Sequence, residues 1–247
     1  MEHNESRRQR KWEPKRPNMK TYAYAIVMIL AGFGAGCSQS EPGSGDFRET
    51  LEFLRSRSDN LDLKTIPGVR IDLRYAGTNN FMGENLYGDF RECFLHRTAA
   101  AKLRQAVRYL RDEKSGHEFL VFDGLRPRSV QRKMWARVKD TPSRDYVADP
   151  ERGSVHNFGL AVDLTVVDEK GRALDMGTDF DSFRPLAETG RERELLRRGK
   201  LRKRQLENRL LLRRAMIRAG FIQLPNEWWH FDSEPAPLVR RDYRIVE

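Results

Sequence analysis

The sequence lacks any strongly apolar run long enough to cross a membrane as a helix, which requires about 20 residues. Its most apolar stretch, residues 21–36, contains no charged side chain but is only 16 residues long. Internal repeats, low-complexity tracts and a second linker are also absent beyond residue 46. A chain of this length and patterning favours one folded domain of about 200 residues, with appendages.

A strong charge imbalance is missing from most of the chain. The formal net charge is +10, of which residues 1–20 contribute +4 through seven Lys or Arg and three Glu. The moderate excess that remains does not require a nucleic-acid partner. Residues 191–218 concentrate twelve Lys or Arg against three Glu, which is typical of a helix with a solvated basic face. Contact with anionic lipid head groups is the alternative for this stretch.

The N-terminal region has the order of an export signal. Lys20 precedes the apolar residues 21–36, and the small residues "GAG" lead directly into Cys37. This arrangement resembles the bacterial lipoprotein lipobox, which implies that Cys37 is lipidated and becomes the mature N-terminus. Residues 1–36 are then a lipoprotein signal peptide, with Met19 as a possible true start, and residues 37–46 a flexible tether. An ordinary signal peptide or a signal anchor remains the alternative.

Cysteine is scarce, and its scarcity limits how the fold is stabilised. If Cys37 carries a lipid, only Cys93 remains, and one thiol cannot form an internal disulfide. An exported domain without disulfides must be stabilised by its hydrophobic core or by a metal. The lipobox resemblance implies a location on the periplasmic side of a membrane. By the rule for the residue after the cysteine, Ser38 indicates the outer membrane if two membranes are present.

Hydrophobic periodicity predicts interleaved helices and strands. Helices are expected from residue 47, after a cap at Thr98, after Pro127, and along the basic stretch with a stripe of Leu206, Leu210 and Ile217. Strands are expected at residues 69–76, 118–123 and 160–167, and around "FIQL" and "EWWHF". Because no regular strand–helix–strand repeat appears, the sequence predicts an α+β fold, a mainly antiparallel sheet flanked by helices.

Two segments place metal-ligating side chains near strands. "SVHNFGLAVDLT" sets His156 seven residues before Asp163, and Gly159 lets the backbone turn between them. A carboxylate among apolar strand neighbours is costly to bury unless it is paired or bound to a metal. "NEWWHFD" adds Glu227 and His230. An ideal strand would point these two side chains to opposite faces, so a bulge or turn must intervene.

Together these side chains can form an open catalytic zinc site. Two imidazoles and one carboxylate bind zinc and leave a fourth position for water, while a second carboxylate outside the ligand set accepts a proton. Arg126, in "DGLRP", follows a buried strand and precedes a rigid proline. A fixed guanidinium at that point can stabilise an oxyanion.

The three segments resemble the zinc D-alanyl-D-alanine dipeptidases. The family pattern S-x-H-x-x-G-x-A-x-D begins at Ser154, E-x-W-H begins at Glu227, and G-x-R-P begins at Gly124. "VRIDLRYAGTNNFMG" and "DMGTDFD" look like further family segments, and the second is expected to shape the substrate pocket. The resemblance covers residues 60–235 in the right order. It implies the fold shared with D,D-carboxypeptidases and the hedgehog signalling domain.

The resemblance also implies a role for each matching residue. One Zn2+ per chain is expected at His156, Asp163 and His230. Glu227 is expected to act as general base and then acid, and Arg126 to polarise the carbonyl. The family's positions near the substrate fall on Tyr75 and Ser154.

The expected activity is zinc-dependent hydrolysis of the small dipeptide D-Ala-D-Ala by a domain over residues 47–247. The alternatives are a D,D- or L,D-carboxypeptidase acting on peptidoglycan stem peptides, and a non-catalytic zinc-containing wall-binding lipoprotein. The expected partners are the D,D-dipeptide and, through the N-terminal lipid, a membrane, with no nucleic acid.

Overall fold

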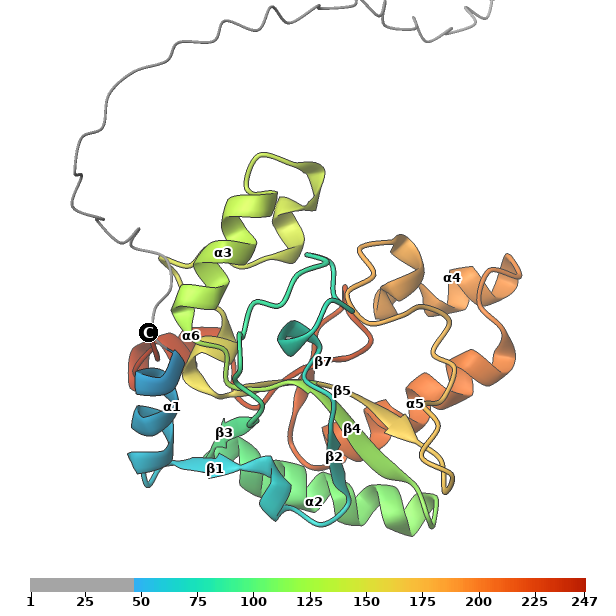
Figure 1. The fold of residues 1–247 in the computed structure, drawn as a ribbon. Helices are drawn as coiled ribbons and strands as arrows, with labels where there is room; N and C mark the ends of the chain where they lie inside the picture. The colour runs from blue at the N-terminus through green and yellow to red at the C-terminus, as the bar shows by residue number, and fades with distance from the viewer. Residues whose placement is uncertain (1–46) are drawn as a thin grey trace, which may run out of the picture. The chain divides into compact units, whose positions relative to one another are not determined.

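The computed structural model describes residues 47–247 (Figure 1), and the expected signal peptide, the expected lipidation site at Cys37 and the expected tether therefore lie outside the described residues. Among the described residues, no helix is both long and apolar enough to span a membrane. The helices are α1 (Phe47–Ser56), α2 (Arg97–Glu113), α3 (Arg128–Val138), α4 (Glu192–Arg197), α5 (Lys203–Arg218) and α6 (Ala236–Asp242). The strands are β1 (Asn60–Asp62), β2 (Val69–Ile71), β3 (Phe94–His96), β4 (Glu118–Asp123), β5 (Ala161–Val167), β6 (Ile222–Gln223) and β7 (His230–Asp232).

A five-stranded sheet organises the domain, in the order β2-β4-β5-β7-β6. Only β2 and β4 run parallel, and the other neighbours are antiparallel. A separate antiparallel pair is formed by β1 and β3. Helices α2 and α5 lie side by side along the sheet (Figure 1), where α2 contacts β4 and α5 contacts β5. The predicted α+β class with a mainly antiparallel sheet is confirmed.

The central strands are buried because their side chains are apolar on both faces. Every residue of β5 is buried, including Asp163, which lies between Val162 and Leu164. On α2, Leu103, Leu110 and neighbouring small residues are fully buried, which places its apolar face in the core. Burial of such side chains stabilises the domain by about 1.5–3 kcal/mol each, before the entropy cost of ordering them.

Two local predictions are wrong at helix α2 and strand β2. The N-cap of α2 is His96, whose Nδ1 accepts the Thr98 N–H at 3.3 Å, so Thr98 lies inside the first turn. The strand expected over residues 69–76 ends at Ile71, and a 3-10 turn (Arg74–Ala76) follows. Tyr75 therefore leaves the sheet and enters the core from this turn.

The stripe expected on α5 is also wrong. Ile217 is 50% exposed, and Leu206 and Leu210 are only half-buried. The buried face instead includes Gln205 and Arg209 together with apolar residues of the last two turns. These polar side chains are buried because they bind another loop: Gln205 Nε2 donates to Asp175, and Arg209 Nε donates to the Met176 carbonyl at 2.7 Å.

The basic stretch 191–218 is extensively neutralised by acidic neighbours. Arg213 donates to Glu192, and Arg202 forms an ion pair with Asp175. Further ion pairs join Arg198 to Glu194 and Arg214 to Glu113. Apart from the largely buried pair of Arg213 with Glu192, these ion pairs are exposed and contribute little to stability, but they reduce the positive potential of the surface.

Candidate active site

The sheet register brings three of the site's side chains into one row across neighbouring strands. Asp123 on β4 pairs with Asp163 on β5, and Asp163 pairs with His230 on β7. Adjacent strands lie about 4.8 Å apart, so residues in register on one face meet. The antiparallel ladder therefore sets the distance between Asp163 and His230.

His156 reaches this row from a short 3-10 turn, Val155–Phe158, that precedes β5. Ser154 caps the turn and Asn157 completes a capping box with it. Gly159 ends the turn with φ +68°, a left-handed conformation that only glycine adopts without strain. Its carbonyl accepts the His96 N–H at 2.8 Å. The expectation that Gly159 folds His156 back toward Asp163 agrees with this geometry.

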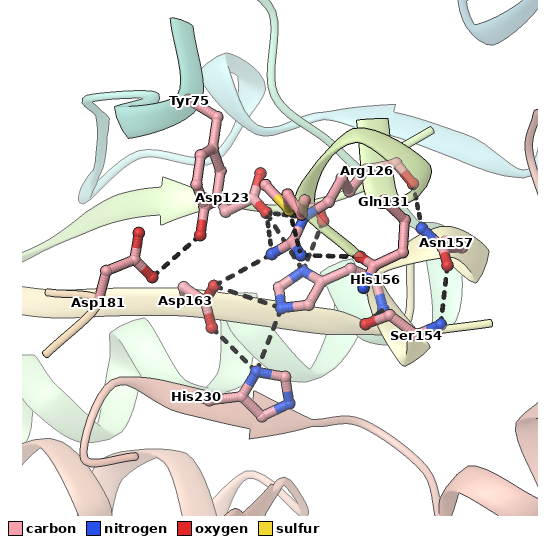
Figure 2. A network of polar contacts seen from close by, with 12 residues as sticks. Tyr75, Asp123, Arg126, Gln131, Ser154, His156, Asn157, Asp163, Asp181 and His230 are labelled. Atoms are coloured by element: carbon pink, nitrogen blue, oxygen red, sulfur yellow. Dashed lines mark hydrogen bonds and ion pairs between the residues drawn. The ribbon is translucent and has the colours of Figure 1, made fainter. Parts of the chain in front are cut away.

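Three ligand atoms converge in the buried centre of the site (Figure 2). His156 Nε2 lies 3.3 Å from Asp163 Oδ2, and His230 Nδ1 lies 3.0 Å from Asp163 Oδ1. The two ring nitrogens are 3.2 Å apart. Among the described residues, His156, Asp163 and His230 form the group able to hold a metal ion, with all three ligand atoms within 4.8 Å of one another. These three residues are the metal group.

The outward nitrogens of both imidazoles are already bound, which fixes the tautomers. His156 Nδ1 lies 2.7 Å from the Gly124 carbonyl, which can only accept, so the proton is on Nδ1. His230 Nε2 lies 2.8 Å from Asp232 Oδ1. With these protons directed outward, two nitrogen lone pairs and a carboxylate face one point. Lone pairs this close repel unless a cation lies between them, and nitrogen plus carboxylate oxygen is a donor set that suits zinc.

The electrostatics of the cluster are dominated by burial and mutual attraction. Burial alone would raise the pKa of Asp163, but His156 and His230 lower it far below its ordinary value. Burial alone would lower the pKa of His230, but the carboxylates of Asp232 and Asp163 raise it well above 6.5. The carboxylate charge that raises the pKa of His230 would also favour a cation held between the three side chains.

Glu227 lies just outside β7, which begins only at His230. Its Oε2 is 3.8 Å from His230 Nδ1, so it adjoins the metal group without belonging to it. The irregular backbone before β7 thus supplies the turn that the spacing of Glu227 and His230 requires. Burial, aided by the charge of Asp163, raises the pKa of Glu227 to about 7. A carboxyl group with this pKa can both accept and return a proton near neutral pH.

The segment carrying Glu227 is held by its two tryptophans. Trp228 Nε1 donates to Thr178 Oγ1 at 2.8 Å, and the Trp229 carbonyl accepts the Leu164 N–H at 3.1 Å. Both indoles are almost completely buried. The aromatic pair therefore anchors Glu227 to β5 and to the loop over residues 175–181.

Arg126 is fixed beside the metal group by the end of β4. Its Nε donates to Asp123 Oδ2 at 2.8 Å, and Nη1 donates to Gln131 Oε1 at 2.9 Å. Nη2 lies 3.8 Å from Asp163 Oδ2. Burial alone would lower the pKa of the Arg126 guanidinium, but the nearby Asp123 carboxylate raises it well above its ordinary value. Arg126 is thus a permanently charged group held in one orientation.

Backbone contacts lock the Arg126 and His156 segments together. The Arg126 N–H donates to the His156 carbonyl at 3.0 Å, and Asn157 Nδ2 donates to the Arg126 carbonyl at 2.8 Å. Figure 2 shows these side chains grouped at one edge of the cluster. Displacement of either segment would therefore disturb the other.

Tyr75 and Asp181 form one wall of the site. The Tyr75 hydroxyl donates to Asp181 Oδ1 at 2.9 Å, and the Tyr75 ring lies 5.0 Å from the guanidinium of Arg126. Asp181 also accepts the Phe81 N–H at 3.3 Å. Burial and the nearby Asp163 raise the pKa of Asp181 to about 8. A cationic ligand beside this carboxyl group would favour its ionised form and lower its pKa.

A cavity of about 270 Å³ lies beside the metal group, and Asp181 and Asp232 are among its lining residues. Tyr75, Arg126, Ser154, His156, Asp163, Glu227 and His230, the site residues expected from the sequence within the described range, all line it. Its volume is at the lower end of the range for ligand pockets, which favours a small ligand.

Three polar residues of the site were missed at the sequence level: Asp123, Asp181 and Asp232. The position of Asp232 near His230 could have been predicted, because residues two apart in a strand share a face and Asp232 follows His230 by two. Asp123 ends a predicted strand, but nothing local indicates that it binds Arg126. Asp181 lies at φ +60° in a long loop, where periodicity gives no information, and only the family-like segment DMGTDFD, which ends at Asp181, indicated that this loop shapes the pocket.

An open three-ligand metal group beside a buried carboxyl of raised pKa and a fixed arginine is the arrangement of a metallopeptidase. The family model described as D-ala-D-ala dipeptidase, peptidase M15, matches residues 58–246. The chain belongs to this family, as its three motifs predicted.

Curated relatives agree with this membership. The chain is 35% identical over 184 residues to D-alanyl-D-alanine dipeptidase of Escherichia coli, covering 74% of this chain and 89% of that one. It is 28% identical over 189 residues to the Enterococcus faecalis enzyme of the same name, covering 69% and 89%. The solved Serratia marcescens L-Ala D-Glu endopeptidase ChiX aligns with 69% of this chain and 93% of its own. The two chains are 21% identical over this alignment, with a TM-score of 0.31.

Proposed function

We propose that this protein hydrolyses the dipeptide D-Ala-D-Ala to D-alanine with one zinc ion held by His156, Asp163 and His230. The observation that carries the proposal is the convergence of two imidazole lone pairs and a carboxylate within 4.8 Å, next to Glu227. The family and the names of the curated relatives support the choice of substrate.

Zinc bound at these ligands would supply a water molecule whose pKa is lowered to about 7. Glu227 is placed to take the proton of that water, because its carboxyl group adjoins the ligands without binding among them. Its pKa of about 7 lets it later return the proton to the departing amine of the product.

Arg126 stabilises the oxygen of the scissile carbonyl as negative charge develops on it. The guanidinium needs little reorganisation, since Asp123 contacts its Nε and Nη2 and Gln131 accepts from its Nη1. Asp181 and Tyr75 lie at the wall of the pocket beside Arg126. The buried Asp181 carboxyl is suited to the free ammonium of a dipeptide, which favours a dipeptide over a longer stem peptide.

Replacing Glu227 by Gln tests the proposal, because it removes the base and keeps the side-chain volume. We expect turnover of D-Ala-D-Ala to fall at least about 100-fold, with zinc content unchanged. The matched variant His156→Ala should lose both zinc and turnover. Undiminished turnover by Glu227→Gln would exclude Glu227 as the base.

We further propose that the domain is exported and anchored to a membrane through a lipid on Cys37, on the periplasmic side and at the outer membrane if two are present. The order of Lys20, the apolar residues 21–36 and Cys37 supports this location. Metabolic labelling with palmitate should mark the wild type and not Cys37→Ser. Labelling of both would contradict lipidation at Cys37.

A further inference from the structure

The active-site pocket has two cationic side chains among its described lining residues, Arg126 and Arg240. The Arg126 guanidinium already donates hydrogen bonds to Asp123 and Gln131. Arg240 has no carboxylate within ion-pair distance among the described residues, although five acidic side chains line the same pocket. The pocket therefore contains one cation whose charge is not matched by the protein.

Arg240 is nevertheless held in place. It lies on α6, which packs against the 3-10 turn carrying His156. Its Nε donates to the Arg152 carbonyl at 3.0 Å, and its Nη2 donates to the Gly153 carbonyl at 3.2 Å. Neutral carbonyls fix the guanidinium without cancelling its charge, and Nη1 has no partner among the residues the structure describes. A half-buried arginine of this kind can bind a carboxylate.

Ser154 provides a second donor next to Arg240. It follows Gly153, whose carbonyl Arg240 binds, and it lines the same pocket. The Ser154 Oγ accepts the His156 N–H at 3.4 Å, while its own hydroxyl proton has no acceptor within the described chain. The lining of the pocket thus includes a hydroxyl and a guanidinium edge, both able to donate, and the residue before Ser154 is bound by Arg240.

We propose that Arg240, assisted by Ser154, binds the free carboxylate of the substrate's C-terminal residue and thereby selects peptides that end there. This inference rests on the proposed dipeptidase function. A dipeptide is a zwitterion: Asp181 suits its ammonium, and Arg240 suits its carboxylate. Asp163 is already bound by His230, and Asp232 is bound by the same imidazole. Neither carboxylate pairs with Arg240, so its positive charge is available to a ligand.

Comparison of D-Ala-D-Ala with its C-terminal amide tests the role of Arg240. The two substrates share the scissile bond and the ammonium and differ only in the carboxylate. For Arg240→Ala we expect kcat/KM on the acid to fall about 10- to 100-fold, mainly through KM, because a charge-assisted contact is lost. On the amide, kcat/KM should change less than about threefold, since that contact is already missing.

Arg241→Ala is the matched control, because Arg241 is exposed on the same helix and pairs with Asp242. It should leave both substrates unaffected. An equal loss on acid and amide in Arg240→Ala would reveal a merely structural role and overturn the inference, as would no loss on either. If the zinc-loaded wild type hydrolysed neither substrate, the proposed function itself would fail, and this inference with it.

Discussion

Each imidazole of the site is oriented by the ring nitrogen that faces away from the ligand cluster. His156 donates to a backbone carbonyl, whereas His230 is bound by the carboxylate of Asp232. A carboxylate partner raises the basicity of the ring and holds it in the tautomer that directs Nδ1 inward. Asp232 is therefore a positioning residue for the metal group, although it is not a ligand.

Replacing Asp232 by Ala tests this role. We expect zinc affinity to weaken about 10- to 100-fold, because the His230 ring loses its anchor. Competition against a fluorescent chelator at fixed pH measures the affinity, and circular dichroism checks that the fold is kept. Asp242→Asn is the control, since Asp242 is exposed and forms an ion pair with Arg241. Unchanged zinc affinity in Asp232→Ala would contradict the role.

Residue types and motif spacing led us to expect His156, Asp163, His230 and Glu227 in one site, and the structure brings them together, but the side chains that support them were not expected. Asp123 and Gln131 hold Arg126 through contacts between separate elements. Such contacts depend on how the elements pack, which no local pattern encodes. The same holds for Arg240, which reaches the pocket from the last helix.

The 3-10 turn before β5 is the element that places His156. Gly159 closes this turn at φ +68°, and a Cβ there would lie 2.9 Å from the His96 backbone nitrogen. Backbone, unlike the tip of a flexible side chain, has little room to move away. The turn therefore requires glycine for both its conformation and its close packing.

Gly159→Ala should lower the free energy of unfolding by about 2 kcal/mol or more, combining left-handed strain with the contact to His96. Urea denaturation of the metal-free protein measures this loss. Gly190→Ala is the matched control, because a Cβ at Gly190 would meet nothing within 4 Å. Equal stability of the two variants would show that the turn tolerates a side chain.

Helix α5 illustrates why the periodicity of an element can mislead. Leu206, Leu210 and Ile217 follow helical spacing, yet the buried face includes Gln205 and Arg209. Those two side chains bind the loop 175–181, which carries Asp181 into the pocket. Burial of polar groups for loop attachment is invisible to a hydrophobic pattern.

At the scale of the whole molecule, the sheet and the loops have separate tasks. Strands β4, β5 and β7 set Asp123, Asp163 and His230 in register, and a rigid ladder keeps their spacing. The loops before and after these strands bring Arg126, His156 and Glu227. The α+β class followed from the mixture of patterns, whereas the parallel pairing of β2 with β4 did not, because pairing partners are long-range choices.

The central claim is that one zinc ion at His156, Asp163 and His230 is required for hydrolysis of D-Ala-D-Ala. The most direct measurement is turnover of this dipeptide before chelation, after chelation and after zinc is restored, with metal content determined in the same samples. We predict about one zinc per chain, loss of turnover in step with loss of zinc, and recovery when zinc is added. Full turnover by protein freed of metal would contradict the account.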